Sequence, residues 1–303
     1  MMKNISTILS YFFCILIGFS LHVSPVNAQR VRLNTGLGLS AYLGDLVQGS
    51  PVFQQTSPAI SVGISYEVLE KLRARINFTN LGIQGNDKYA ARKDLRDRNL
   101  SFKSNIFEVA FLAEYDFVNN DEYSIVPYVF AGPSIYKFNP TTIDANGEKV
   151  NLHAIGTEGQ YLPSGLYDDR RYNLTQMNIQ YGLGIKYKIS EIVSLGGEFS
   201  FRNTFTDYLD DVSTTYIAPQ EFINAGQTQA LLLNYRQYEI DGRPVNFGQP
   251  RGGSKSKDFF YTFQIRATFN LLGLNFGKDL DFYSSPGRSY KYRNKVRNPK
   301  NIF

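Results

Sequence analysis

The chain has 303 residues, a formal net charge of +5, 43% hydrophobic and 15% aromatic residues, one cysteine and two histidines. Its many tyrosines, phenylalanines and glycines favour β-structure over helical domains. The single cysteine excludes a disulfide scaffold, and two histidines leave little scope for metal or acid–base chemistry.

The N-terminus predicts an export signal. Lys3, an apolar run over residues 8–19 and the small-residue site Val26-Asn27-Ala28 are the three parts of a secretory signal. The apolar run is shorter than the roughly 20 residues that a membrane-spanning helix needs. We therefore expect cleavage between Ala28 and Gln29, which removes residues 1–28. Cys14 lies in this segment and lacks the small residues that normally precede a lipidated cysteine, so we expect no lipid anchor.

Eight segments of alternating apolar and polar residues follow, each typical of a strand with one apolar face. In the first, residues 31–42, Leu33 and Leu37 oppose Arg32 and Asn34. The others are residues 59–68, 72–80, 105–117, 125–138, 176–189, 193–203 and 259–271. Residues 125–138 are apolar on both faces around residues 127–133, so the sequence predicts a strand there without indicating which face points inward.

The connections distinguish a membrane barrel from a soluble sandwich, which would show the same alternation. Short turns at residues 69–71, 118–124 and 190–192 alternate with long segments at 43–58, 81–104, 139–175 and 204–258. This pattern is typical of short periplasmic turns and long extracellular loops. We predict an all-β fold: an eight-stranded antiparallel transmembrane β-barrel over residues 29–272, surrounded by the lipid of the cell outer membrane.

The predicted interior of the barrel carries both signs of charge. A barrel of eight strands is filled by its own side chains, and charges inside it need compensation. We therefore predict an ion-paired lumen in preference to a proton or ion pathway. Glu67 and Lys188 share this inner face. The main predicted network comprises Arg32, Arg73, Arg75, Glu108, Glu114, Asp116, Lys186, Glu198, Arg202 and Arg266.

The glycine pairs Gly36/Gly38 and Gly182/Gly184 superficially suggest a phosphate loop. Both pairs fall in the middle of predicted strands, and neither is followed by a helix. We interpret them as positions that make space in the barrel interior.

The predicted loops offer few candidates for chemistry. His153, with Glu148 and Glu158 nearby, is the one histidine after the signal, and we expect neither enzymatic activity nor a cofactor. Residues 144–148 resemble part of a calcium loop, but their Asn-Gly pair favours a hairpin turn.

A second acidic group, Asp207, Asp210 and Asp211, could hold a cation at the barrel rim. A solvated acidic loop is the commoner explanation of such a cluster, and we predict no metal. We also expect neither nucleic acid nor a small-molecule substrate as a partner.

The segment after the last strand, residues 273–303, is basic. It carries seven basic residues, Lys278, Arg288, Lys291, Arg293, Lys295, Arg297 and Lys300, against Asp279 and Asp281. An even number of strands places both ends of the chain on the periplasmic side, so we predict a periplasmic tail that is disordered unless bound. Such a tail could contact peptidoglycan, an acidic partner or nothing.

Four strings in the predicted loops and strand ends resemble one family. They are SAYLGDL at residues 40–46, GTEGQ at 156–160, YNLTQ at 172–176 and FTDYLDDVS at 205–213, and the last, with Asp207, Tyr208, Asp210 and Asp211, is the most specific. They resemble the PorG-type barrels of the Bacteroidetes type IX secretion system, within the OmpA-like barrel superfamily.

The resemblance implies a subunit that associates with a periplasmic ring of PorK/PorN-like proteins. The machine exports proteins and, in gliding bacteria, supports motility. The resemblance implies no catalytic residues. The alternative is a free-standing OmpA-like barrel whose extracellular loops bind ligands or partners.

Overall fold

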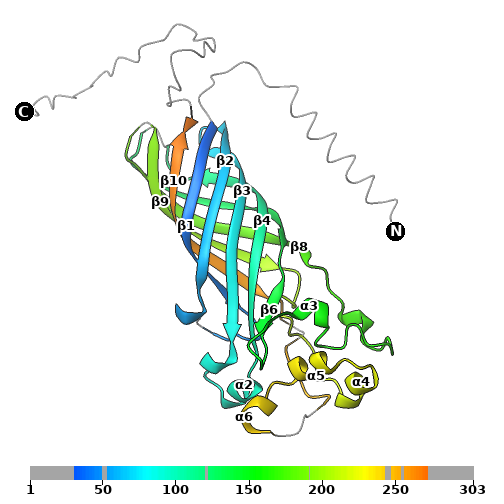
Figure 1. Ribbon diagram of the computed structural model, residues 1–303. Coiled ribbons are helices and arrows are strands. Elements are labelled where there is room, and N and C mark those ends of the chain that lie inside the picture. The colour runs from blue at the N-terminus through cyan, green and yellow to red at the C-terminus, as the bar shows by residue number, and fades with distance from the viewer. Residues whose placement is uncertain are drawn as a thin grey trace, which may run out of the picture. The chain divides into compact units, whose positions relative to one another are not determined.

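The alternating segments form eight long antiparallel strands that close into a barrel (Figure 1). Neighbouring strands pair in the order β3-β2-β1-β10-β9-β8-β5-β4, and a β3–β4 ladder closes the ring, so the predicted eight-stranded barrel is confirmed. The strands are β1 (Val31–Leu43), β2 (Ser57–Leu69), β3 (Leu72–Asn86), β4 (Ser101–Asp116), β5 (Ile125–Lys137), β8 (Thr175–Lys188), β9 (Val193–Thr204) and β10 (Phe259–Asn270).

The computed structural model describes residues 31–49, 53–119, 122–190, 192–242, 247–253 and 256–271, all within the unit Met1–Gly273. The predicted cleavage site at Ala28 and Gln29 and the basic tail at residues 273–303 lie outside the described residues. Among the described helices, none combines the length and the apolar character needed to cross a membrane.

The fifth predicted strand, β5, has a clear orientation in the structure. Tyr128, Phe130 and Ser134 are buried in the barrel, whereas Val129 and Ile135 are exposed on its outer wall. The sequence did not reveal this orientation because the inward positions of β5 include large apolar side chains.

Strands β3 and β4 extend beyond their predicted ends, and their polarity inverts where they do. Up to Phe78, β3 has apolar residues outside and polar residues inside; from Leu81 onward, its inward residues are apolar and its outward residues polar. The same change occurs in β4 between Ile106, which is buried, and Phe107, which is 52% exposed. The register pairs Leu81 with Ile106, so both strands invert at one level.

This inversion marks the level at which the sheet leaves the apolar band and continues as an ordinary water-exposed barrel wall. The predicted loop at residues 81–104 is therefore wrong for residues 81–86 and 101–104, which are strand. The alternation of apolar and polar residues is interrupted there, because the apolar side chains change from the outward face to the inward face.

The long connections fold into a cap at one end of the barrel, which is the lower end in Figure 1. Their elements are η1 (Phe53–Gln55), η2 (Asp87–Tyr89), α2 (Lys93–Arg98), β6 (Pro140–Ile143), β7 (Lys149–Asn151), α3 (Leu152–Ile155), η3 (Asp168–Arg170), α4 (Pro219–Asn224), α5 (Thr228–Asn234) and α6 (Tyr238–Asp241). The connections predicted as loops thus contain helices and a short hairpin.

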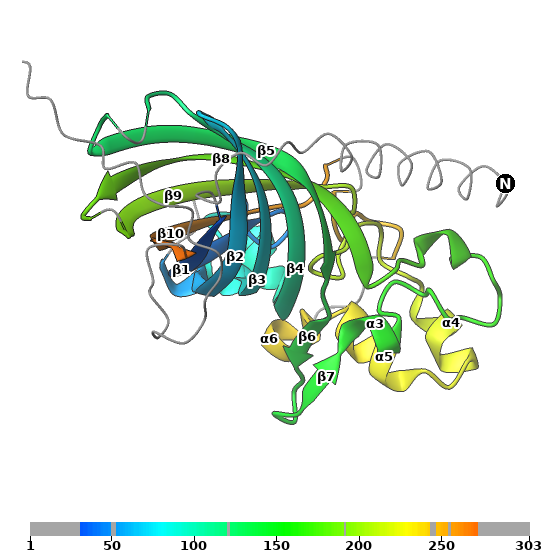
Figure 2. The ribbon, with the colours of Figure 1, turned by 90° about the horizontal axis from the view of Figure 1, so that it is seen from above.

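The hairpin β6–β7 continues the sheet from the end of β4 and lies outside the ring of eight strands (Figure 2). Its turn is the predicted Asn-Gly turn. Asp144 Oδ1 accepts hydrogen bonds from the backbone N–H groups of Asn146 and Glu148, both at 2.9 Å, and Gly147 adopts φ +84°. That left-handed conformation suits glycine, which has no Cβ.

Candidate functional site: an ion-paired lumen and a buried cap network

Glu114 is the centre of the larger of two ion-pair groups in the lumen. Its carboxylate lies 2.7 Å from Lys186 Nζ, 2.9 Å from Arg75 Nη1 and 3.2 Å from Arg266 Nη1. Glu198 joins the same cations, at 2.7 Å from Arg75 and 2.6 Å from Arg266. Two carboxylates are thus shared among three cations contributed by β3, β8 and β10.

The same group extends toward the short-turn end of the barrel through Asp116. Asp116 pairs with Arg73 and lies 2.7 Å from Lys186 Nζ. Arg73 also lies 3.5 Å from Glu67, which is 3.6 Å from Arg32.

A second, smaller group surrounds Glu108 nearer the cap. Arg202 Nε and Nη2 each donate to Glu108 Oε2 at 3.1 Å, and Arg202 Nη1 donates to Thr262 at 2.8 Å. Ser134 and Asn178 donate to the other oxygen of Glu108, each at 2.9 Å. All ten residues of the predicted network thus take part in ion pairs inside the barrel, while Lys188, at the end of β8, is half-buried.

Two aromatic rings on β5 complete the lumen, and glycines on β8 make room for them. Tyr128 faces Gly184 across the ladder, and Phe130 faces Gly182. A Cβ on Gly184 would lie 2.4 Å from the Tyr128 ring, and one on Gly182 would lie 2.5 Å from Phe130. Lys186 Nζ lies 4.4 Å from the centre of the Tyr128 ring, a distance typical of a cation–π contact.

The cap has a hydrophobic core of its own. The inverted ends of β3 and β4 supply Leu81, Ile83 and Phe102, while the long connections supply Leu152, Leu209 and Leu233. Tyr42 and Phe260, at the ends of β1 and β10, belong to the same cluster. The cap therefore packs directly onto the barrel rim.

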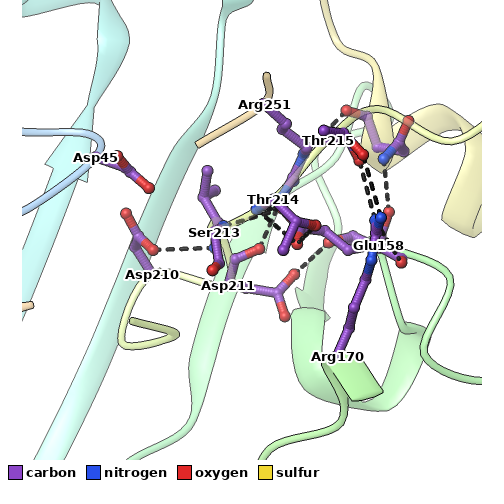
Figure 3. A network of polar contacts seen from close by, with 12 residues as sticks. Asp45, Glu158, Arg170, Asp210, Asp211, Ser213, Thr214, Thr215 and Arg251 are labelled. Atoms are coloured by element: carbon purple, nitrogen blue, oxygen red, sulfur yellow. Dashed lines mark hydrogen bonds and ion pairs between the residues drawn. The ribbon is translucent and has the colours of Figure 1, made fainter. Parts of the chain in front are cut away.

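The four strings singled out in the sequence meet in a buried polar network beside this core, which we call the cap network. Figure 3 shows the part of it around Glu158, Asp211 and Arg251. Tyr42 Oη lies 2.6 Å from Asp210 Oδ2 and 2.8 Å from Asp258 Oδ1. Asp211 accepts hydrogen bonds from Thr157 and from Tyr172 Oη, the latter at 2.6 Å. Residues up to 216 positions apart in sequence are thus in direct contact.

Glu158 connects the second string to the fourth. Its carboxylate accepts hydrogen bonds from the backbone N–H of Ser213 at 3.0 Å and from Thr214 Oγ1 at 2.6 Å. Arg251 pairs with Glu158 at 2.9 Å and donates to the carbonyl oxygen of Asp211 at 2.7 Å. Because both charges of the Glu158–Arg251 pair are buried and hydrogen-bonded, the pair fixes the β5–β8 connection against the β9–β10 connection.

Arg98, the last residue of α2, ties a further connection into the cap network. Its guanidinium donates to both oxygens of Asp87, at 2.7 and 2.8 Å, and to the carbonyl oxygens of Arg251 at 2.6 Å and Asp45 at 2.8 Å. Burial raises the pKa of Asp87 despite its pairing with Arg98. Sequence reasoning missed Arg98, Arg251 and Asp258, because no periodicity or spacing singles them out.

The aspartates of the cap network have raised pKa values, mainly because they are removed from water. Burial raises the pKa of Asp207 to about 7, with a contribution from Asp45. Burial also raises the pKa of Asp211 to about 6, against the opposing effect of Arg251. The pKa values of Asp210 and Asp258 are well above the ordinary carboxyl value, because both groups are buried and lie close together.

The interpretation of residues 207–211 as a solvated acidic loop is wrong. Asp207, Asp210 and Asp211 are 5%, 1% and 0% exposed, because the cap core and the cap network enclose them. Tyr208 stacks on Tyr172, with ring centroids 4.7 Å apart. In the part of the chain that the structure describes, no group of three or more His, Cys, Asp or Glu side chains could hold a metal ion.

His153 has structural contacts in α3. Its Nε2 lies 3.0 Å from the carbonyl oxygen of Tyr172, and its ring meets the Tyr172 ring edge-on at 4.8 Å. Of the two glutamates near it in sequence, Glu148 is exposed in the hairpin turn, and Glu158 is committed to Arg251.

The sequence of residues 12–218 matches the family described as the outer membrane protein beta-barrel domain, which is more than half of the chain. The protein belongs to this family. No curated protein matches the chain. Outer-membrane localisation follows from the family, and the alternation of short turns and long loops places the cap of this outer-membrane barrel on the extracellular side.

Solved structures of small outer-membrane barrels are similar over most of the chain. Neisserial surface protein A has 10% identity and a TM-score of 0.40, over 79% of this chain and 96% of that one. Ail of Yersinia pestis, solved with the heparin analogue sucrose octasulfate, has 8% identity and a TM-score of 0.37, over 80% and 97%. OprG from Pseudomonas aeruginosa has 9% identity and a TM-score of 0.39, over 80% and 96%.

Proposed function

We propose that this outer-membrane barrel is a non-enzymatic subunit of a type IX protein secretion system in a Bacteroidetes bacterium. In this role it anchors a periplasmic ring of PorK/PorN-like proteins to the outer membrane and, in a gliding species, supports motility. The observation that carries the proposal is the cap network. The four strings that resemble PorG-type barrels are scattered over residues 40–213. They contact one another through Tyr42, Thr157, Glu158, Tyr172, Asp210 and Asp211.

The lumen supports an anchoring role over a conducting one. Glu114 and Glu198 are 1% and 3% exposed, and each is bound to two or more cations. Moving an ion past them would break buried pairs at a high free-energy cost. A barrel of this kind is suited to hold its position in the membrane while partners bind to its outer surfaces.

The rival proposal is a free-standing OmpA-like barrel whose extracellular loops bind ligands or partners. The cap offers one observation in its favour, a polar groove of about 500 Å³ at the outer end, lined in part by Arg92, Tyr216 and Tyr235. Such a groove would take a partner from outside the cell, whereas the anchor meets its partner in the periplasm.

A paired co-purification experiment separates the two proposals. Three forms are expressed in the native bacterium: the intact chain, the chain without residues 273–303, and the intact chain with Glu158→Gln, which perturbs the cap alone. The anchor proposal predicts that the ring proteins co-purify with the intact chain and with Glu158→Gln, and are lost with the tail.

Recovery of no ring protein by the intact chain would refute the anchor. The loop-binding alternative predicts a different result, in which a partner is lost with Glu158→Gln and retained without the tail. Equal membrane levels of the three forms, checked by immunoblotting, are the control.

A further inference from the structure

A groove lies on the outer wall of the barrel, just beyond the level at which β3 and β4 invert their polarity. It has a volume of about 430 Å³, and its lining residues come from β2, β3 and β4 and from the hairpin β6–β7. On the side nearer the membrane it is lined by Ile60 and Asn80, and on the side nearer the cap by Lys103, Asn105 and Lys149. The edge of the groove nearer the membrane thus adjoins the exposed apolar band, and the part nearer the cap is polar.

The charge at this level of the outer wall has one sign. Among the described strands, the charged side chains that point outward beyond Phe107 are Lys103, Lys137 and Lys149, with no carboxylate. Lys103 and Lys149 form no ion pair with any carboxylate of the described residues. Glu148, next to Lys149 in sequence, lies in the exposed turn and does not line the groove.

The groove lies at the outer edge of the headgroup layer of the membrane. Phe107, 52% exposed, is the last outward apolar residue of β4. Lys103 is four residues further, about 13 Å along the strand and roughly 10 Å along the membrane normal at a tilt of about 40°. The headgroup layer is about 5–7 Å deep, and a lysine side chain can reach down into it.

We propose that this groove binds the phosphate-bearing headgroup of an outer-leaflet lipid. Lys103 and Lys149 bind the phosphate, and the asparagine side chains Asn80 and Asn105 donate hydrogen bonds to the adjoining polar headgroup. The acyl chains lie along the apolar wall that begins at Ile60. Continuity of a cationic groove with a lipid-facing surface favours this occupant, because a soluble anion would gain nothing from the apolar edge.

Native mass spectrometry of the full mature chain in a neutral detergent tests the proposal. The probe is diphosphorylated lipid A, and its dephosphorylated form is the matched lipid. Each lysine near a charged surface contributes about a fivefold change in affinity, so Lys103→Gln with Lys149→Gln is expected to weaken binding about 25-fold. Removing the phosphates from the lipid should weaken binding to the wild type similarly.

The double variant Lys88→Gln with Lys93→Gln is the control, since it removes the same charge from exposed positions on the cap. It should bind lipid A like the wild type. The proposal is overturned if the groove variant retains wild-type affinity, if the control loses as much, or if both lipids bind equally. Lysines this exposed do not hold the fold together, and a heat-modifiability gel confirms that each variant is folded.

Discussion

Replacement of Glu114 by glutamine is the sharpest test of the ion-paired lumen. The carboxylate of Glu114 lies between Lys186, Arg75 and Arg266 at 2.7–3.2 Å and is 1% exposed. Glutamine has nearly the same shape, so the change removes the charge while leaving the packing intact. Any loss of stability then measures electrostatics and not a cavity.

The magnitude follows from the charges of the larger lumen group. Its five cations face four carboxylates: Arg32, Arg73, Arg75, Lys186 and Arg266 against Glu67, Glu114, Asp116 and Glu198. Glu114→Gln leaves five cations against three carboxylates. Removing one partner of a buried pair typically lowers the free energy of unfolding by about 3–5 kcal/mol, and we expect a loss in that range.

The opposite change in the same group should be milder. Lys186→Met leaves four cations against four carboxylates, and Glu114 and Asp116 both keep an arginine partner. We expect a loss of about 1–2 kcal/mol, the size of an unmade buried hydrogen bond. The two changes together should be less destabilising than their sum, because the residues are in contact.

Urea unfolding of the barrel refolded into phospholipid vesicles, followed by tyrosine fluorescence and gel mobility, measures all three variants. Glu148→Gln, in the exposed hairpin turn, is the control for loss of a carboxylate. A Glu114→Gln variant within about 0.5 kcal/mol of the wild type, or one more stable than Lys186→Met, would refute the charge argument, since ordinary surface changes reach that size.

Three further predictions concern the cap and the lumen glycines. Glu158→Gln should speed amide hydrogen exchange in residues 207–214 by about 100-fold, because it removes the charge that Arg251 and the backbone bind. Amides of the same residues should lose protection as pH rises from about 4 to 7. The pKa of Asp207 is raised to about 7 in the folded protein, so the folded state is stabilised while this carboxyl is protonated and loses that stabilisation as it ionises. Asp207→Asn should flatten this dependence on pH. Gly184→Ala should lower the free energy of unfolding by about 1–3 kcal/mol, because its Cβ would meet the Tyr128 ring.

Each of these predictions has its own control and its own contrary result. For the pH dependence, exchange rates are corrected for their intrinsic dependence on pH. Protection that rises with pH would refute a destabilising ionisation of Asp207. Gly197→Ala should be nearly neutral, since its nearest neighbour lies at 3.8 Å. If it is as destabilising as Gly184→Ala, the glycines of β8 do not make room for the rings. Unchanged exchange in Glu158→Gln would show that the cap does not depend on its buried ion pair.

The barrel was predictable because its physical signal is local. Alternation along each strand showed the two faces, and the basic inner face of β3 beside the acidic inner face of β4 pointed to pairs such as Arg73 with Asp116. The orientation of β5 was not predictable, because Tyr128 is apolar in character yet points inward over Gly184.

The cap was not predictable from local patterns. Glu158 and Arg251 lie 93 residues apart, in connections without periodicity. The aspartates at residues 207–211 lie in a polar string that suggested exposure, and they are buried because distant segments cover them. The resemblance of the four strings pointed to these residues, but it contained no information on what they contact.

The exchange of faces along β3 and β4 sets an order of assembly for the chain. From Phe78 and Phe107 toward the short turns the outer wall requires lipid, whereas Leu81, Ile83 and Phe102 require contact with the other extracellular segments. Those segments reach the cell surface only after the strands have been inserted. The hydrophobic cluster outside the membrane must therefore form last, and an inserted barrel exists for a time with its extracellular hydrophobic residues unprotected from water.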